Sequence, residues 1–193
     1  MSAVTTFDST KSFLKDILKE ITIGKIQLPD FQRGWVWDDE RIKSLLASVS
    51  LSFPIGAVMM LQTGNDEVRF KPRLIEGLEL KPQPEPKELI LDGQQRLTAL
   101  YQAILRKEAV ETEDIRKKPI KRYYYIDIEK ALNPYIDREE CIRSIPEDRI
   151  VRNFRGETVV DYSIPEHEFE AGFFPLNQVL DSSNWRMAYQ EYW

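Results

Sequence analysis

The sequence of 193 residues predicts an α+β domain, a small mixed sheet with helices packed on it. Apolar residues recur at helical spacing in several segments, and short apolar or aromatic runs of strand type lie between them. The composition, 42% hydrophobic and 31% charged, is that of an ordinary globular protein. The Pro-rich segment 81–88 is too short to separate two domains. The chain is therefore expected to form one domain with a sizeable core, or one domain and the start of another.

The N-terminal part predicts a helix followed by a strand. The helix carries its apolar residues on one face: Phe13, Leu14, Ile17, Leu18 and Ile21. Thr10 or Ser12 can cap this helix, and Gly24 can end it. Residues 25–28 alternate between polar and apolar, which favours a short strand that Pro29 ends.

A second helix follows, capped by Asp38 or Asp39. Its inward-facing residues are expected to be Ile42, Leu45, Leu46 and Val49. Trp35 and Trp37 precede it and are expected to pack against it, because large aromatic side chains dominate core energetics. Two further strands are predicted, at residues 57–61 and 68–75.

The rest of the chain is organised around residues 89–105, which read LILDGQQRLTALYQAIL. Residues 89–91 are a short apolar run of strand type, and Asp92-Gly93 indicates a turn. From Gln94 onward the apolar period is helical, through Leu97, Leu100, Tyr101, Ile104 and Leu105. The pattern predicts a buried strand that turns sharply into an amphipathic helix.

This turn has the chemistry of an anion site. The first N–H groups of a helix have no intrahelical partner and lie at the positive end of the helix dipole. Gly93 allows a tight turn and a close ligand approach, and Arg96 offers a planar cationic fork suited to phosphate. Asp92 can cap the helix, hold a metal or orient a water. The structural alternative is a plain cap with a solvated Gln-Gln-Arg turn.

Gln32 and Arg33 form a second polar pair, in the loop between the first strand and the second helix. Phe31 and Gly34 flank them. A charged residue in such a loop is usually solvated, but loops on rigid scaffolds also carry function.

Two separated stretches, LPDFQRGWVWDDERIKSLLASVSLSFPIGAVMML and LILDGQQRLTAL, resemble a known family. They are similar to the DGQQR-motif domain that forms the N-terminal part of GmrSD-type modification-dependent restriction enzymes and of related phosphorothioate-sensing nucleases, within the ParB/sulfiredoxin-like superfamily. The resemblance covers about residues 10–180 and implies a nucleoside-triphosphate site. The motif residues correspond to Gln32, Arg33, Asp92, Gly93, Gln94, Gln95 and Arg96.

The resemblance and the chemistry of the turn together predict binding and hydrolysis of a nucleoside triphosphate with Mg²⁺, gating DNA cleavage in a bacterial defence system. The helix start, Arg96 and Arg33 would hold phosphates, and Gln94 or Gln95 would orient water or phosphate oxygens. Asp92 would bind Mg²⁺ or act as a base. The alternatives are a ParB-like DNA-nicking nuclease and a non-catalytic nucleotide- or DNA-sensing module.

Charge and cysteine content limit which other kinds of site and partner the chain could have. The net charge of −5 means that DNA contact would need a local patch, and the densest basic cluster is Arg116, Lys117, Lys118, Lys121 and Arg122. A solvated face is the alternative for this cluster. One cysteine excludes an internal disulfide and fits a reducing cytoplasmic location, and a single His and a single Cys disfavour zinc. No signal peptide or long apolar span is visible.

Beyond the central helix the sequence predicts a charged connector, a strand, two short helices and a hairpin, at residues 108–122, 122–128, 129–132, 137–144 and 149–162. A last helical pattern runs to Trp193 without a C-cap. The expected organisation is a DGQQR-type domain over residues 1–177 and the start of a helical region at 178–193. A C-terminal domain or a partner nuclease subunit would complete the protein.

Overall fold

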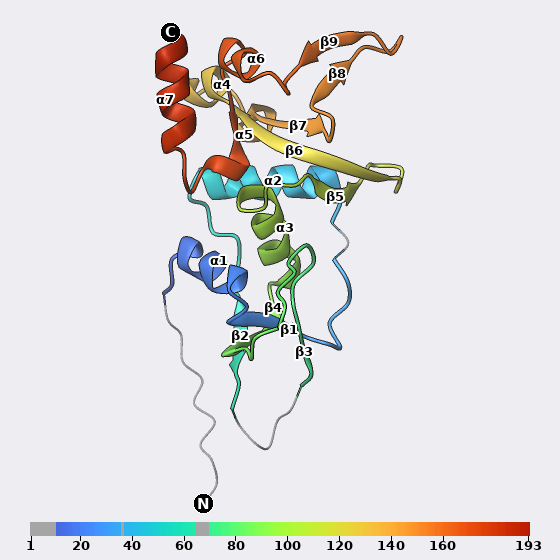
Figure 1. The fold of residues 1–193 in the computed structure, drawn as a ribbon, viewed down its shortest axis with the longest axis vertical. Coiled ribbons are helices and arrows are strands. Elements are labelled where there is room, and N and C mark those ends of the chain that lie inside the picture. Colours follow the sequence, from blue (N-terminus) through green and yellow to red (C-terminus); the bar gives the residue numbers. More distant parts are fainter. Residues whose placement is uncertain (1–10, 36, 65–69) are drawn as a thin grey trace, which may run out of the picture.

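A computed structural model describes residues 11–35, 37–64 and 70–193. It shows an α+β fold with two small sheets and a separate hairpin (Figure 1). The elements in chain order are α1 (Leu14–Thr22), β1 (Ile26–Pro29), α2 (Asp39–Ser50), β2 (Met59–Gln62), β3 (Pro72–Arg73), β4 (Glu88–Asp92), α3 (Gln94–Ile104), β5 (Val110–Glu113), β6 (Pro119–Asp127), α4 (Ile128–Leu132), α5 (Arg138–Cys141), β7 (Ile142–Pro146), β8 (Ile150–Arg152), β9 (Thr158–Asp161), α6 (Pro165–Glu170), β10 (Phe173–Pro175), η1 (Leu176–Gln178) and α7 (Ser183–Tyr192). The predicted α+β class and the hairpin at 149–162 are confirmed.

The first sheet is mixed and has the strand order β2-β4-β1-β3. Its two central strands, β1 and β4, are parallel, and β2 and β3 pair antiparallel with β4 and β1. Neighbouring parallel strands point the same way, so the loops that follow β1 and β4 leave the sheet at the same end. This topology brings the two sequence motifs to one place.

The strand β1 is buried along its whole length, including Gln27. Its predicted polar–apolar alternation therefore does not correspond to an inside and an outside face. The Gln27 amide donates to the carbonyl oxygens of Gly24 and Pro84, at 2.8 and 2.7 Å, and accepts from Gln83 at 2.8 Å. These bonds explain how a polar side chain is tolerated in the centre of the sheet.

The second sheet is built on β6, the longest strand. β5 and β10 pair with one edge of β6, and β7 pairs with the other. Two predictions are corrected here. The connector at 108–122 is largely the hairpin of β5 and β6, and the helix predicted at 137–144 ends at Cys141, where β7 begins. β5 and β7 are strands because they pair with β6, and local sequence patterns could not show this pairing.

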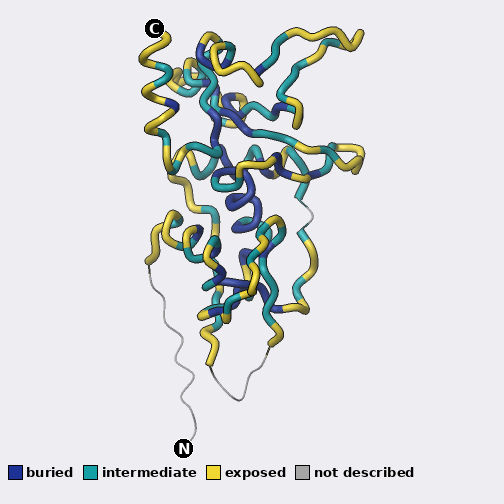
Figure 2. The backbone as a smooth tube through the Cα atoms, in the orientation of Figure 1, coloured by how far each residue is buried: buried dark blue, intermediate teal, exposed yellow. Residues whose placement is uncertain are grey.

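The core continues from one sheet to the other through α2 and α3. In Figure 2 the buried backbone is concentrated along α3, at the centre of the molecule, and Figure 1 shows α2 crossing above it. Buried residues of this cluster include Leu18, Ile42, Leu97, Leu100 and Tyr124. Trp35 and Trp37 pack against it, as predicted.

The two aspartates at the start of α2 have different hydrogen-bond partners. Asp38 is the N-cap and accepts from the N–H of Arg41 at 3.0 Å. Asp39 accepts from the hydroxyls of Tyr124 and Ser144, at 2.8 and 2.7 Å, and so ties α2 to the second sheet. Burial beside this carboxylate raises the pKa of Tyr124 well above its usual value. The sequence left the choice between the two aspartates open.

The first helix begins later than expected. Its N-cap is Phe13, with no side-chain cap bond, and Phe13 is 80% exposed rather than on the buried face. Ser12 is therefore not the cap, and Thr10 lies outside the described residues. Gly24 has φ +70°, which confirms it as the helix stop. Of the strand predicted at 68–75, the described part contains only β3, and Val68 lies outside the described residues.

The last helix, α7, packs on the body of the domain through aromatic rings. Trp185 lies 4.9 Å from Phe174 of β10 and 5.4 Å from Phe169 of α6, measured between ring centroids. Edge-to-face pairs of this kind add stability beyond the area they bury. The division of the chain at residue 177 stays a prediction.

Candidate functional site

The candidate site lies at the end of the first sheet where β1 and β4 both terminate. Residues 30–35, here called the QR loop, follow β1, and residues 92–96, the DGQQR turn, follow β4 into α3. Far apart in sequence, the two segments become neighbours because β1 and β4 are adjacent and parallel. Carboxyl ends of parallel strands are a common location for ligand sites.

Three glutamine amides hold the two segments together. Gln32 of the QR loop donates to main-chain oxygens of β4 at 2.8 and 3.3 Å. In the opposite direction, Gln94 donates to the carbonyl oxygen of Arg33 at 2.7 Å. Gln95 donates to the carbonyl oxygen of Gly34 at 3.2 Å. These three glutamines thus fix the QR loop against the start of α3.

A second set of contacts supports the QR loop from outside. The Arg73 guanidinium donates to the carbonyl oxygens of Gln32 and Arg33, both at 3.3 Å. It also pairs with Glu76 at 2.9 Å, and the same Glu76 oxygen accepts from the N–H of Trp35 at 3.2 Å. Sequence reasoning missed Arg73 and Glu76. Their spacing of three residues was the available signal, but it did not show that they reach the loop.

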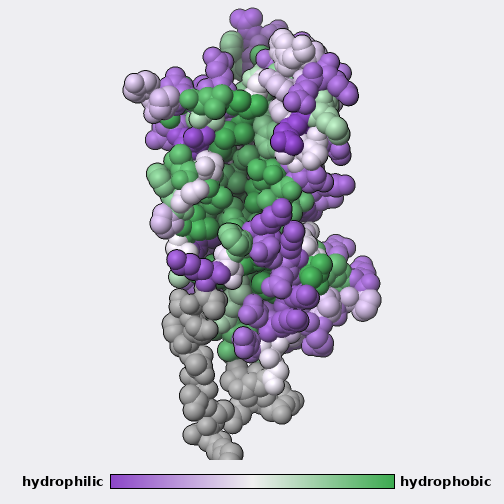
Figure 3. Space-filling model, turned by 90° about the vertical axis from the view of Figure 1, so that its left-hand side faces the viewer, coloured by the Kyte–Doolittle hydropathy of each residue, from purple (hydrophilic) through white to green (hydrophobic). Residues whose placement is uncertain are grey.

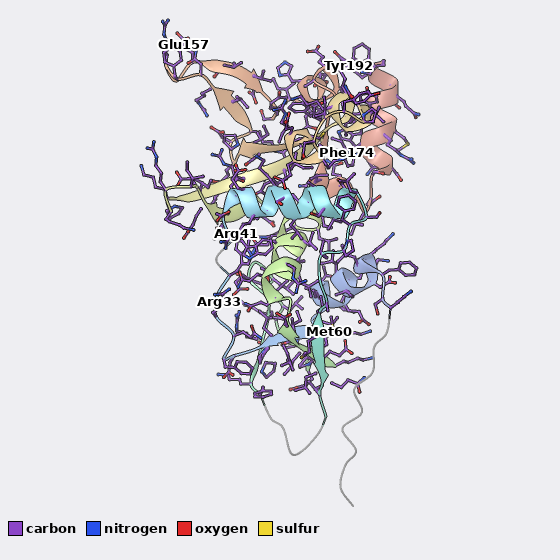
Figure 4. The ribbon with its side chains drawn as sticks, turned by 180° about the vertical axis from the view of Figure 1, so that it is seen from behind. Arg33, Arg41, Met60, Glu157, Phe174 and Tyr192 are labelled. Carbon is purple, nitrogen blue, oxygen red and sulfur yellow. The ribbon has the colours of Figure 1, made fainter. Side chains whose placement is uncertain are left out.

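The Arg33 side chain is exposed, in contrast to the backbone of its loop. Within the described residues no carboxylate forms an ion pair with it. Figure 4 shows Arg33 at the margin of the molecule, on the loop that leads to α2, where Arg41 also lies. Arg33 is therefore held in place by its backbone, and its guanidinium has no carboxylate partner in the described part of the chain.

Arg96 is engaged by protein groups. Its guanidinium donates to the carbonyl oxygens of Ile55 and of Ala57, the latter at 2.8 Å, and lies 3.5 Å from the carboxylate of Asp92. Arg96 therefore fixes the loop between α2 and β2 beside the start of α3. Its predicted role in phosphate binding stays a prediction. The guanidinium would have to donate to a phosphate in addition to these two carbonyl oxygens.

Gly56 lies directly against Arg96, and Gly56→Ala is expected to destabilise the domain. Gly56 has φ +95°, and an added Cβ would overlap the Arg96 guanidinium. The backbone strain alone costs about 1–3 kcal/mol, and the added Cβ would also displace the Arg96 guanidinium from the carbonyl oxygens of Ile55 and Ala57. At roughly 2–4 °C per kcal/mol the melting temperature should fall by at least several degrees.

Gly64→Ala is the matched control for this prediction. Gly64 has φ +97° and no described atom within 4 Å of an added Cβ, so it carries the strain without the overlap. Melting curves of both variants measure the difference. Equal melting temperatures would show that the contact between Gly56 and Arg96 is unimportant.

Asp92 does not cap α3. It is the last residue of β4, and the N-cap is Gly93, which has φ +92° and gives no side-chain cap bond. The carboxylate of Asp92 is 72% exposed. Capping is thus removed from the three roles predicted for Asp92, and the roles in metal binding and water activation stay predictions. An added Cβ at Gly93 would lie 3.0 Å from a side-chain carbon of Val58, a tight contact that adds to the preference for glycine at φ +92°.

The donor set suits Mg²⁺ better than a transition metal. The described residues contain no group of three or more His, Cys, Asp or Glu side chains placed to hold a metal ion. Mg²⁺ is usually bound by one or two carboxylates together with substrate phosphates and waters. Asp92 offers one exposed carboxylate for this purpose, and the exposed Asp30 of the QR loop lies at the same end of the sheet.

The predicted basic cluster is interleaved with acids. Lys117 lies 3.6 Å from Glu113 and 3.8 Å from Asp38. Lys121 lies 3.3 Å from Glu147, and this hydrogen bond is the main cause that raises the pKa of Lys121. The face around the hairpin of β5 and β6 is therefore mixed in charge, and a DNA contact there stays a prediction.

The sequence that carries these two motifs matches a defined family. Residues 14–171 match the family described as the N-terminal domain of the GmrSD restriction endonuclease, and the chain belongs to this family. The uncharacterized protein MJ0686 of Methanocaldococcus jannaschii is 33% identical to the chain over 181 residues. That match covers 91% of the chain but 29% of the relative, so the chain spans less than a third of the relative's length.

The family takes its name from a restriction endonuclease, and the match confirms the resemblance to the GmrSD N-terminal domain seen in the sequence. None of the helices in the described ranges has the length and apolar composition needed to cross a lipid bilayer.

Proposed function

We propose that this domain binds a nucleoside triphosphate with Mg²⁺ between the QR loop and the DGQQR turn, hydrolyses it, and thereby gates DNA cleavage by another part of the restriction system. One observation carries the proposal. The amides of Gln94 and Gln95 hold the QR loop against the start of α3, so the exposed cation Arg33 and the N-terminus of an 11-residue helix belong to one surface.

The phosphates would bind at this helix start. Gly93 leaves α3 without a side-chain cap, and its lack of a Cβ allows close approach to the backbone. Arg33 adds a planar charged fork, which suits phosphate oxygens. Gln94 is buried and bonded to the QR loop, so we assign it to positioning.

The hydrolytic role falls to the groups at the edge of the turn. Asp92, together with phosphate oxygens, would hold Mg²⁺, which supplies charge neutralisation on the phosphates when bound. Asp92 would also orient the attacking water or accept its proton, and Gln95 would help to orient it. Arg96 keeps the 55–57 backbone beside the start of α3 and would contribute positive charge to the site.

The superfamily assignment is part of the proposal. We place the first sheet with α3 in the ParB/sulfiredoxin-like class, supported by the two functional loops at the carboxyl ends of adjacent parallel strands. The name of the family and the greater length of the relative support a separate part of the system as the site of DNA cleavage.

Binding is tested first by thermal shift. A nucleoside triphosphate present with Mg²⁺ at about 100 times its Kd should stabilise the domain by about 2.7 kcal/mol. For a domain of this size that is a rise of roughly 5–11 °C. The four ribonucleoside triphosphates are compared with their nucleosides, which lack the phosphates. No shift with any of the four at millimolar concentration would contradict the proposal.

A further inference from the structure

An open apolar groove lies on the second sheet. Its lining residues fall between 126 and 186, after both segments of the candidate site in the sequence. It is formed between α4, the η1 turn and α7 and has a volume of about 540 Å³. Its lining includes Leu132, Phe174, Val179 and Trp185. Figure 3 shows hydrophobic side chains gathered in a hollow on the face of the molecule that carries α7.

The groove exposes side chains that the domain does not need to expose for its own packing. Leu132 is 80% exposed and Val179 is 44% exposed, although both line the same groove as the buried ring of Trp185. Contiguous exposed apolar surface of this kind marks interaction sites in soluble proteins. Scattered single residues would carry no such meaning, but here they line one continuous hollow.

The charged residues on the lining are Arg138 and Arg186, and no acidic residue lines the groove. Neither arginine forms an ion pair with any described residue, although seven of the eleven other described arginines do. The groove thus combines an apolar floor with two arginines that form no ion pair with any described carboxylate. An occupant that complements it must offer apolar side chains and negative charge.

We propose that this groove docks an acidic amphipathic helix of a partner protein. A helix can place residues i, i+3, i+4 and i+7 on the apolar floor and keep its polar face in water. Glutamate or aspartate beside that apolar stripe would pair with Arg138 and Arg186. An open hollow suits a helix, which needs to bury only one face, better than a small ligand, which is normally enclosed over most of its surface.

The test uses two synthetic helical peptides of about 18 residues, or five turns. Both have leucine on one face and alanine elsewhere. They differ in the flanking positions, which are glutamate in one peptide and lysine in the other. Binding to the 193-residue chain is measured by fluorescence anisotropy. The glutamate peptide should bind at least about tenfold more tightly, since two ion pairs replace two repulsions.

Charge reversal gives the decisive variant. In the Arg138→Glu/Arg186→Glu chain the preference should invert in favour of the lysine peptide. Leu132→Glu should weaken both peptides roughly tenfold by placing a charge on the apolar floor. Arg155→Glu and Tyr135→Glu are the matched controls, because both side chains are exposed and neither lines the groove. Circular dichroism confirms that each variant is folded.

Equal binding of the two peptides, or a preference unchanged by the double reversal, would overturn the proposal. Sedimentation equilibrium gives a further check. A concentration-dependent dimer that Leu132→Glu abolishes would assign the groove to a second copy of the chain instead. A monomer at all concentrations agrees with the helical partner.

Discussion

Asp92→Asn is expected to lower nucleotide hydrolysis by about a hundredfold or more while the domain remains folded. Loss of a general base or of a group that positions the nucleophile typically has an effect of this size. Stability should change little, because Gly93 rather than Asp92 is the helix N-cap. The contact of Asp92 with Arg96, at 3.5 Å, is largely exposed and contributes at most about 1 kcal/mol.

Phosphate release and melting temperature are measured on the same preparation. Asp181→Asn is the matched control, because Asp181 is an exposed carboxylate between η1 and α7, outside both the QR loop and the DGQQR turn. Turnover by Asp92→Asn equal to that of the control would return Asp92 to a structural role. The thermal shift with nucleotide measures binding separately. A failed prediction for catalysis would therefore leave the predicted binding site untouched.

Arg33→Ala is expected to weaken nucleotide binding by about 10- to 150-fold, with the melting temperature of the free domain unchanged. The range corresponds to roughly 1.5–3 kcal/mol for hydrogen bonds to a charged group. Only the backbone of Arg33 is used by the fold, and its side chain is exposed. Arg33→Lys should also be impaired, because lysine keeps the charge but loses the bidentate fork.

Combination with Arg96→Lys tests whether the two arginines share a ligand. Arg96→Lys should in addition lower the stability of the free domain, because Arg96 holds the 55–57 loop. In a double-mutant cycle on nucleotide affinity, residues that act on one ligand should be coupled by more than about 0.5 kcal/mol. Arg41→Lys is the control, since Arg41 lies on the neighbouring helix and pairs with Asp38. Additive effects would restrict the site to Arg33 and the helix start.

The sequence by itself determined the local elements around the site. The apolar run at 89–91, the turn at Gly93 and the helical period from Gln94 correspond to β4, the N-cap and α3. The placement of Gln32 and Arg33 in a loop between a strand and a helix was also correct. These features depend on residues close together in the chain, where propensity and periodicity are informative. Family membership followed from the same two motifs.

Only the tertiary structure decided which of these elements contact one another. Parallel pairing of β1 with β4 brought the two motifs together, and the amides of Gln94 and Gln95 were found to bind carbonyl oxygens of the QR loop. Arg96 was found to donate to carbonyls of a loop about forty residues away, and Asp92 lost its capping role to Gly93. β7 appeared where a helix was expected, because β6 offered an edge to pair with. Each of these outcomes depends on partners distant in sequence, and a local pattern contains no information on which donor will meet which acceptor across the fold.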